Sequence, residues 1–263
     1  MSRISFDRVA DCYDATRALP PDALAAITGG IARALRDVAP APSLLEVGVG
    51  TGRIAVPLAT EGIRLTGIDI APAMLAHLRA KRPEVAIALA DATSLPFPSA
   101  TFDGVLFVHI LHLLPDPAAA LRAAQAATRS DGILLYGRTD HAEHPRRQVI
   151  ARARALVREI AGVDVASRER NHTADRTFAD HARSVGAPLA QATLARWVEH
   201  FSGRGLLTAL ANRTYSSTWA ISEAAMPELL RRLTPQVDAL CGGLDRSIDS
   251  PAAFILLTAR LPG

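Results

Sequence analysis

The residues whose types and spacing favour chemistry stand in one short stretch, where an apolar run leads into closely spaced glycines. Residues 44–53 read Leu-Leu-Glu-Val-Gly-Val-Gly-Thr-Gly-Arg. A strand that ends in a glycine-rich turn before a helix lets the backbone approach a ligand closely, and it directs free N–H groups and the positive helix end at an anion. The segment therefore predicts a ligand site, and the anion bound there is a pyrophosphate or a carboxylate.

The spacing of these glycines separates two kinds of nucleotide site. A dinucleotide-binding turn follows the pattern G-x-G-x-x-G, which requires a glycine at position 53. Position 53 is Arg53, and the third glycine, Gly52, comes one residue early. This departure argues against a nicotinamide-dependent oxidoreductase on a Rossmann fold, which stays an alternative because an acidic residue after the second strand serves both kinds of site.

The spacing G-x-G-x-G after Glu46 resembles the first motif of the class I S-adenosylmethionine-dependent methyltransferases. Three further blocks, at 67–75, 90–97 and 102–116, follow in that family's order. The resemblance implies an enzyme that takes S-adenosylmethionine as cofactor and releases S-adenosylhomocysteine. The chain resembles the small-molecule members, including those of ubiquinone and menaquinone biosynthesis, which implies O-, N- or C-methylation of a small molecule.

The resemblance also implies roles for individual residues. Asp69 would bind the ribose hydroxyls, because a carboxylate can accept two hydrogen bonds from a cis-diol. Asp91 would take the exocyclic amine of adenine, and Glu46 would support the cationic sulfonium. The residues expected to bind the cofactor are Tyr13, Arg17, Glu46, Gly48, Gly50, Thr51, Gly52, Arg53, Asp69, Ile70, Met74, Asp91, Ala92, Val108 and His109.

The amino-terminal segment, residues 6–14, is similar to the start of many small-molecule methyltransferases. In those proteins a leading helix caps the cofactor, so Tyr13 or Arg17 would reach its carboxylate. The residues themselves allow a simpler interpretation, in which Phe6, Val9 and Tyr13 form an apolar stripe that packs the helix onto the domain. Both interpretations can hold together.

Methyl transfer from a sulfonium asks little of the protein beyond alignment of donor and acceptor. A general base is needed only if the acceptor is a hydroxyl or a protonated amine. The candidates are His109 and His112, with His141 and Tyr136 as further possibilities, because all four follow or end the fourth and fifth strands. His109 can equally support the cofactor or the strand edge. A protein that binds S-adenosylmethionine without turnover also stays open.

Hydrophobic patterning predicts the elements that carry these residues. Strand-like and helix-like runs alternate from about residue 23 to 137, which is typical of a parallel sheet with helices on both faces. Strands are expected at 44–47, 65–69, 85–89, 104–108, 133–136 and 253–257. Helices are expected at 54–59, 72–82, 118–128, 146–160, 176–184 and 226–240.

Pattern and resemblance together predict an α/β fold, a Rossmann-like, doubly wound, mostly parallel seven-stranded sheet with helices on both faces and helical lid additions. We expect a single methyltransferase domain over 1–263. Its parts would be an N-terminal capping helix in 1–22, a cofactor-binding core in 23–140, and substrate-side helices, lid and closing strands in 141–263.

Composition and motifs disfavour several functions. A formal net charge of +3 over 263 residues is too small for a nucleic-acid surface, and residues 108–111 lack the Asn/Asp-Pro-Pro-aromatic motif of DNA amino-methyltransferases, so no DNA partner is expected. A phosphate-binding loop of the Walker type needs Gly-Lys-Ser/Thr, and the only lysine, Lys81, lies outside such a sequence. Hydrolysis of nucleotide triphosphates by that route is therefore excluded.

The remaining features concern location, membranes and metals. No apolar run approaches the roughly 18 residues of a membrane-spanning helix, so we expect no stable membrane insertion. Charged residues crowd the first positions, which makes the cytoplasm the expected location. Cys12 and Cys241 are too isolated for a metal site, and no metal is expected. The sequence leaves the oligomeric state open.

Overall fold

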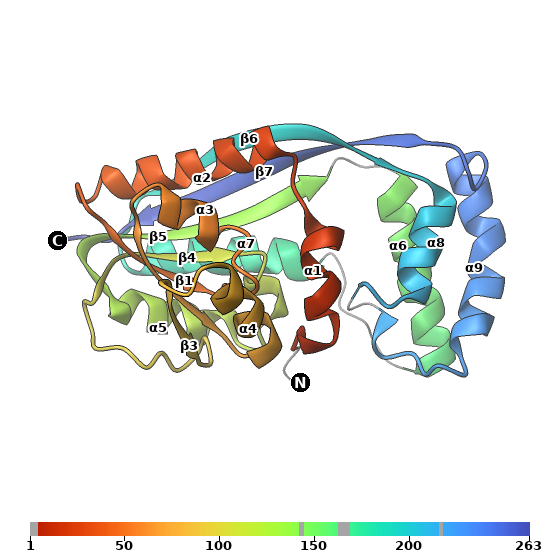
Figure 1. Cartoon of the computed structure of the whole chain (residues 1–263), viewed down its shortest axis with the longest axis horizontal. Helices are drawn as coiled ribbons and strands as arrows, with labels where there is room; N and C mark the ends of the chain where they lie inside the picture. Colours follow the sequence, from red (N-terminus) through yellow and green to blue (C-terminus); the bar gives the residue numbers. More distant parts are fainter. Residues whose placement is uncertain (1–4, 142–144, 163–168, 216–217) are drawn as a thin grey trace. The chain divides into compact units, whose positions relative to one another are not determined.

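A seven-stranded sheet organises the computed structural model, which describes residues 5–141, 145–162, 169–215 and 218–263. The strand order is β3-β2-β1-β4-β5-β7-β6, and the pairings from β3 to β5 are parallel (Figure 1). This arrangement confirms the predicted fold class. The strands are β1 (Ser43–Val47), β2 (Arg64–Asp69), β3 (Ala86–Leu89), β4 (Phe102–Val108), β5 (Thr128–His141), β6 (Leu189–Phe201) and β7 (Ile248–Arg260).

Helices connect and flank these strands. Prolines stand in the first turn of α2, α4 and α5, where the fixed φ of proline suits the helix and its missing N–H would be unpaired in any case. The helices are η1 (Asp7–Val9), α1 (Ala10–Arg17), α2 (Pro21–Arg36), α3 (Ala55–Thr60), α4 (Pro72–Lys81), η2 (Leu111–Leu113), α5 (Pro117–Ala127), α6 (Pro145–Ala161), α7 (Glu169–Ser184), α8 (Gly203–Ala211) and α9 (Met226–Cys241).

The chain divides into two compact units. The core unit comprises 1–139, 171–196 and 253–263, and the helical unit comprises 140–170 and 197–252. The expected substrate-side part, 141–263, is therefore shared between the two units, because α7 and parts of β6 and β7 belong to the core unit. The expectation of a single domain stays a prediction.

The sheet of the core unit is apolar on both faces. Every residue of β4 is buried, as expected for a central parallel strand. Helices α5 and α7 cover one face, where Leu121 and Phe178 join the same buried cluster as Val105 and Phe107. The opposite face is covered by α2, whose Leu35 lies so close to Gly104 that a Cβ there would meet it at 2.6 Å.

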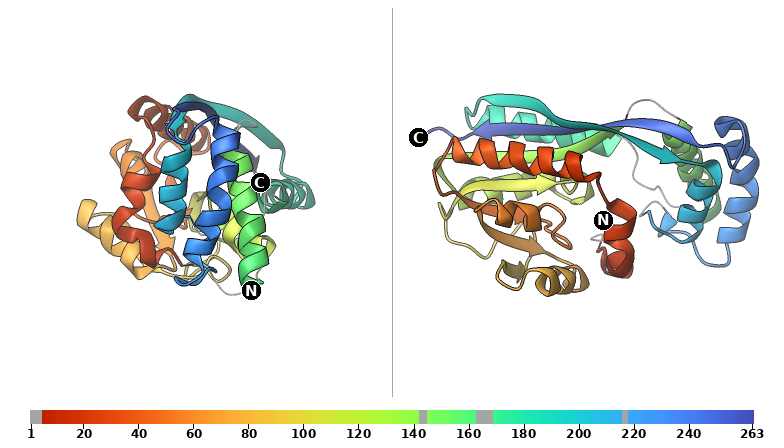
Figure 2. Two further views of the ribbon diagram at one scale, coloured as in Figure 1. Left: turned by 90° about the vertical axis from the view of Figure 1, so that its right-hand side faces the viewer. Right: turned by 45° about the horizontal axis from the view of Figure 1, so that its top comes forward.

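The helical unit has an apolar core of its own. Helices α6, α8 and α9 lie side by side (Figure 2) and share one buried cluster. Val149, Ala153 and Val157 of α6 are buried at helical spacing, while Arg152 and Arg158 are exposed. The predicted amphipathic helix is thus confirmed, with Arg152 and Arg158 on its outer face, whereas Arg146 is part-buried and pairs with Glu199. Within the described residues, no helix is long and apolar enough to cross a membrane.

Several elements differ from the sequence-based expectation. Helix α7 begins at Glu169 and strand β7 at Ile248, seven and five residues before their expected starts. Strand β5 begins at Thr128, five residues early, and absorbs a bulge in which Asp131 has φ +59°. Strand β6 was not predicted, because most of its residues are exposed or half-buried and it lacks the apolar run of a central strand. Helices α2 and α8 were not predicted either.

The buried carboxylate of Asp103 joins three strands at the edge opposite the glycine-rich turn. It accepts hydrogen bonds from Ser43 N (2.8 Å), Ser43 Oγ (2.7 Å) and Arg129 Nη1 (2.7 Å). Burial alone would raise the pKa of Asp103, but the bonds from Ser43 and the Arg129 ion pair outweigh it and lower the pKa. The ionised carboxylate therefore fixes the starts of β1, β4 and β5.

We expect Asp103→Ala to reduce the free energy of unfolding by about 1–3 kcal/mol near neutral pH, because buried donors lose their acceptor. Since the pKa of Asp103 is lower in the folded state, its contribution is present above the ordinary aspartate pKa and is lost as pH falls through the folded value. Urea unfolding across this pH range measures the effect. Removal of the exposed Glu84, paired with Arg82, serves as the control, and equal losses from both variants would contradict the prediction.

Candidate functional site

The chemistry-bearing residues collect at the carboxyl edge of the parallel strands. β1 lies between β2 and β4, so the connections on its two sides run in opposite directions. In open α/β sheets, ligands bind at the carboxyl end of a strand in this position. The turn at 48–52 follows β1, Asp69 ends β2, Asp91 follows β3 and His109 follows β4. The structure therefore brings the end of β1 and the three neighbouring strand ends to one edge.

The glycines of the turn are required by its backbone conformation. Gly48, Gly50 and Gly52 have φ of +73°, +56° and +82°, in the left-handed region that side chains disfavour. A Cβ on Gly48 would lie 2.1 Å from Ile110 Cδ1, and one on Gly52 would lie 2.4 Å from Leu78 Cδ1. The spacing G-x-G-x-G thus reflects both a conformational and a packing constraint.

Asp69 holds this turn against the end of β2. Its Oδ2 accepts the N–H of Gly50 at 2.9 Å, and its Oδ1 accepts the N–H of Ala71 at 2.9 Å. Burial raises the pKa of Asp69, and these backbone hydrogen bonds counteract the shift only in part. Each carboxylate oxygen can accept more than one hydrogen bond, so Asp69 retains capacity for the two hydroxyls of a diol.

Glu46 provides the observation that points most directly to a ligand. The residue is 2% exposed, and among the described residues its Oε2 has no hydrogen-bond partner. Burial raises the pKa of Glu46 to about 8, Arg53 opposes this shift, and Asp69 adds to it. A buried acceptor left without a donor costs about 1–3 kcal/mol. S-adenosylmethionine fits here, because it carries an ammonium, a sulfonium and a diol that these carboxylates can receive.

Asp91 caps a turn at the end of β3. Its Oδ1 accepts hydrogen bonds from Thr93 N at 2.8 Å and Thr93 Oγ1 at 2.7 Å. The neighbouring Ala92 is buried, and the N–H of Ala90 binds the carbonyl of Asp69 at 3.0 Å. Asp91 thus lies next to the Asp69 turn, and its contact with adenine stays a prediction.

The amino-terminal residues mainly pack. The Tyr13 ring meets Phe6 edge-on at 6.1 Å, next to a small cluster of Ala10, Ala71 and Met74. This confirms the apolar interpretation of the helix and places Met74 in the core. The predicted contacts of Tyr13, Arg17, Ile70 and Val108 with a cofactor stay predictions.

Arg53 points back to the amino-terminal helix. Its Nη1 donates to the carbonyl oxygen of Arg17 at 2.7 Å. Arg17 is the last residue of α1, so the guanidinium also lies at the negative end of that helix. The arginine in place of a third dinucleotide-type glycine is therefore explained by a contact with α1.

His109 is built into the edge of the sheet. Its backbone has φ +55°, and its N–H donates to the carbonyl of Gly137 at 3.0 Å. Its Nε2 lies 3.2 Å from Thr139 Oγ1, and its ring meets Phe254 edge-on at 6.0 Å. These contacts connect β4 to β5 and β7 and favour a supporting role. His112 lies on η2 and is half-buried.

The other two base candidates differ in position. Tyr136 is fully buried within β5, and its hydroxyl has no hydrogen-bond partner in the described part of the chain. Burial raises the pKa of Tyr136 further, so we correct the expectation that it could act as a base. His141 belongs to the helical unit, where burial lowers its pKa and Glu199 lies 3.9 Å away.

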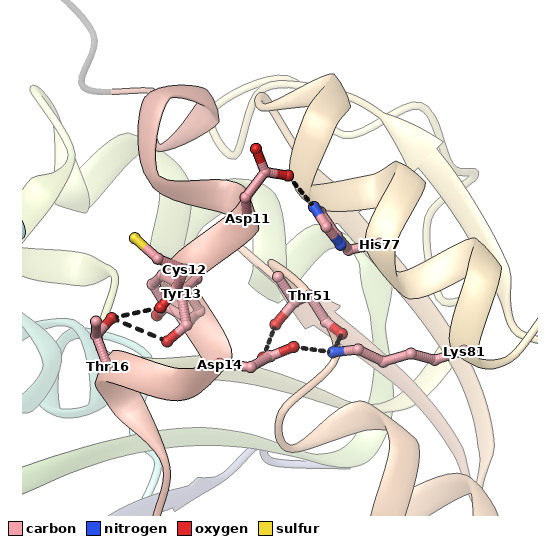
Figure 3. Close-up of polar contacts among 8 residues, drawn as sticks. All are labelled: Asp11, Cys12, Tyr13, Asp14, Thr16, Thr51, His77 and Lys81. Atoms are coloured by element: carbon pink, nitrogen blue, oxygen red, sulfur yellow. Dashed lines mark hydrogen bonds and ion pairs between the residues drawn. The ribbon is translucent and has the colours of Figure 1, made fainter.

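Asp14 and Lys81 contact the turn, although the sequence did not single them out for this site. Thr51 Oγ1 donates to Asp14 Oδ1 at 2.5 Å, and Lys81 Nζ donates to the Thr51 carbonyl at 2.8 Å (Figure 3). The helical spacing of Asp7, Asp11 and Asp14 is the signal that could have marked an acidic face along η1 and α1.

Comparison with known proteins identifies the span that holds this site. Residues 45–136 match the family described as a methyltransferase domain. A demethylmenaquinone methyltransferase of Renibacterium salmoninarum is 28% identical over 206 residues, which cover 73% of this chain and 79% of that protein. A malonyl-[acyl-carrier protein] O-methyltransferase of Serratia marcescens is 30% identical over 132 residues, half of each chain.

A solved structure shows the same fold. A protein of Bacillus halodurans superposes with a TM-score of 0.57 at 17% identity, covering 89% of this chain and 100% of that chain. At this identity the likeness concerns the fold alone. The matched family span includes the glycine-rich turn, Asp69, Asp91 and His109.

We expect Glu46→Gln to flatten the dependence of stability on pH. The folded-state pKa of Glu46, about 8, exceeds its ordinary value of 4.5, so its contribution is fully present below 4.5 and is lost as pH rises through 8. Over this pH range, the free energy of unfolding of the wild type should fall by on the order of a few kcal/mol relative to that of the glutamine variant. Urea unfolding at several pH values tests this, with the exposed Glu61→Gln as control, and parallel profiles of wild type and Glu46→Gln would refute it.

Proposed function

Because the chain belongs to the class I S-adenosylmethionine-dependent methyltransferases, we propose that it transfers a methyl group from this cofactor to a small organic molecule. The observation that carries the proposal is the buried, unpartnered Glu46 oxygen beside the glycine-rich turn and Asp69, all within the matched span. The cofactor supplies a methyl group already activated on a sulfonium. The residues of this chain have to bind, orient and shield it.

In our proposal, each of the three carboxylates binds a different part of the cofactor. Asp69 accepts the ribose hydroxyls through lone pairs that its backbone donors leave unused. Asp91 receives the adenine amine, and Glu46 faces the cationic end. A positive charge beside Glu46 would favour its ionised form, so the raised pKa of Glu46 describes the protein without ligand.

The acceptor we propose is a small molecule. Two relatives are named for acting on demethylmenaquinone and on malonyl-[acyl-carrier protein], which supports an acceptor outside nucleic acids. The oxidoreductase alternative is not favoured, since the matched family and these relatives are methyltransferases. His109 supports the strand edge in this proposal, and His112 and His141 are the remaining candidates if the acceptor must lose a proton.

We expect Asp69→Ala to weaken binding of S-adenosylhomocysteine by roughly 10–100-fold, which corresponds to the loss of charged hydrogen bonds worth about 1.5–3 kcal/mol. Titration calorimetry measures this, and circular dichroism checks that the variant folds. Glu61→Gln, on the surface of the core unit, serves as control and should bind as the wild type does. Unchanged affinity of Asp69→Ala, or wild-type binding of NAD in preference to S-adenosylhomocysteine, would overturn the proposal.

His109 can be tested with two variants that differ in backbone preference. Asparagine tolerates the left-handed φ of +55° and alanine does not, so His109→Ala should lose about 1–2 kcal/mol of stability and His109→Asn much less. If His109 only supports the strand edge, His109→Asn keeps turnover within a few-fold of the wild type. A loss of about 10²–10⁴ in turnover by both variants, with affinity intact, would instead identify a general base.

A further inference from the structure

Helices α1 and α4 are joined along one acidic face. The acidic residues of the amino-terminal segment recur at helical spacing, and each meets a donor one turn further along α4. The contacts join Asp7 Oδ1 to the N–H of Ala73 at 2.8 Å, Asp11 Oδ1 to His77 Nε2 at 3.1 Å, and Asp14 Oδ2 to Lys81 Nζ at 2.5 Å. Figure 3 shows the latter two pairs between the two helices.

The pair formed by Asp14 and Lys81 differs from the others because it also reaches the glycine-rich turn. Asp14 Oδ1 accepts from Thr51 Oγ1 at 2.5 Å, and Lys81 Nζ donates to the Thr51 carbonyl at 2.8 Å. The three residues thus form a closed ring of hydrogen bonds, with Thr51 buried and the two charged side chains part-exposed (Figure 3). In the part of the chain that the structure describes, Asp11 contacts α4 and no residue of the turn.

One peptide group of the turn is held at both ends, by the ring on one side and by a backbone hydrogen bond on the other. Lys81 binds the carbonyl of Thr51, while the N–H of the next residue, Gly52, donates to the Val49 carbonyl at 3.0 Å. Gly50 and Gly52 flank Thr51, and glycine loses more backbone freedom on ordering than any other residue. A turn with three glycines therefore depends on such outside contacts for a single conformation.

The chemistry of the two charged side chains suits this task. Lys81 is the only lysine in a sequence that uses arginine everywhere else for its cations. A lysine ammonium is compact and has three donors, so one nitrogen can serve a carboxylate and a carbonyl at once. Burial alone would raise the pKa of Asp14, but the hydrogen bonds from Lys81 and Thr51 outweigh it and lower the pKa.

We propose that Asp14 and Lys81 are positioning residues for the cofactor turn, which they hold through Thr51 and thereby make dependent on the seating of α1. The inference rests on the proposed function, because the turn is taken as the cofactor site. It assigns a purpose to the amino-terminal helix that apolar packing alone would not give. Removing either side chain releases the Thr51 peptide while leaving the Asp7 and Asp11 contacts in place.

The test uses three variants: Lys81→Met, Asp14→Asn and the double variant that carries both changes. Each is compared with a control variant, Asp11→Ala. Hydrogen exchange in the ligand-free protein reports on residues 48–54 and, separately, on α1. Titration calorimetry with S-adenosylhomocysteine reports on affinity. Asp11→Ala is the matched control, because it breaks a contact between the same two helices without touching the turn.

We expect Lys81→Met and Asp14→Asn each to speed exchange at 48–54 and to weaken binding roughly ten-fold. The double variant should lose no more than about the larger single loss, because both residues act through one ring. Asp11→Ala should loosen α1 and leave affinity within about two-fold. Protected exchange at 48–54 in Lys81→Met, or an equal loss of affinity in Asp11→Ala, would overturn the inference. If the wild type fails to bind the ligand, the proposed function fails, while the exchange measurement still decides whether Lys81 and Asp14 hold the turn.

Discussion

The hydrogen bonds that Asp69 accepts from Gly50 and Ala71 are the constraint on which the candidate site depends. They hold the turn after β1 against the turn after β2, and the backbone bonds from Gly48 and Val49 to the Ile68 carbonyl continue the same seam. A turn with positive φ at three glycines cannot hold such a shape by itself. The carboxylate that organises the turn is also the one for which we propose contacts with the ribose diol.

This arrangement places two carboxyl groups close together at a buried edge. Burial raises the pKa of both Glu46 and Asp69. The charge of Asp69 raises the pKa of Glu46 further, and the charge of Asp7 raises the pKa of Asp69 further. Such a site costs stability without a ligand and favours a cationic one, since an added positive charge relieves the repulsion. Residues 45–136 match a methyltransferase domain, and the cofactor that we propose for this site carries a positive charge, so the electrostatics of the edge support the proposal.

The amino-terminal helix links this edge to the rest of the core unit by two kinds of contact. Tyr13 and Ala10 pack on Met74, and this apolar contact stabilises the helix against the core unit without fixing its orientation. Hydrogen bonds set the register, because Arg53 binds the end of α1 and Thr51 binds Asp14. The supporting role of His109 is similar in kind, since its ring and backbone connect β4 to β5 and β7.

The sequence by itself determined what depends on neighbours along the chain. Glycine spacing predicted the turn at 48–52, and apolar runs predicted β1, β2 and β4. These elements were enough to predict the fold class and to place Asp69 at the end of β2. Contacts between distant residues were decided only by the tertiary structure: Asp14 meets Thr51 from 37 positions away, and Tyr136, a base candidate by its position, is buried. Periodicity reports which face of an element is apolar, but not which distant side chain lies opposite it.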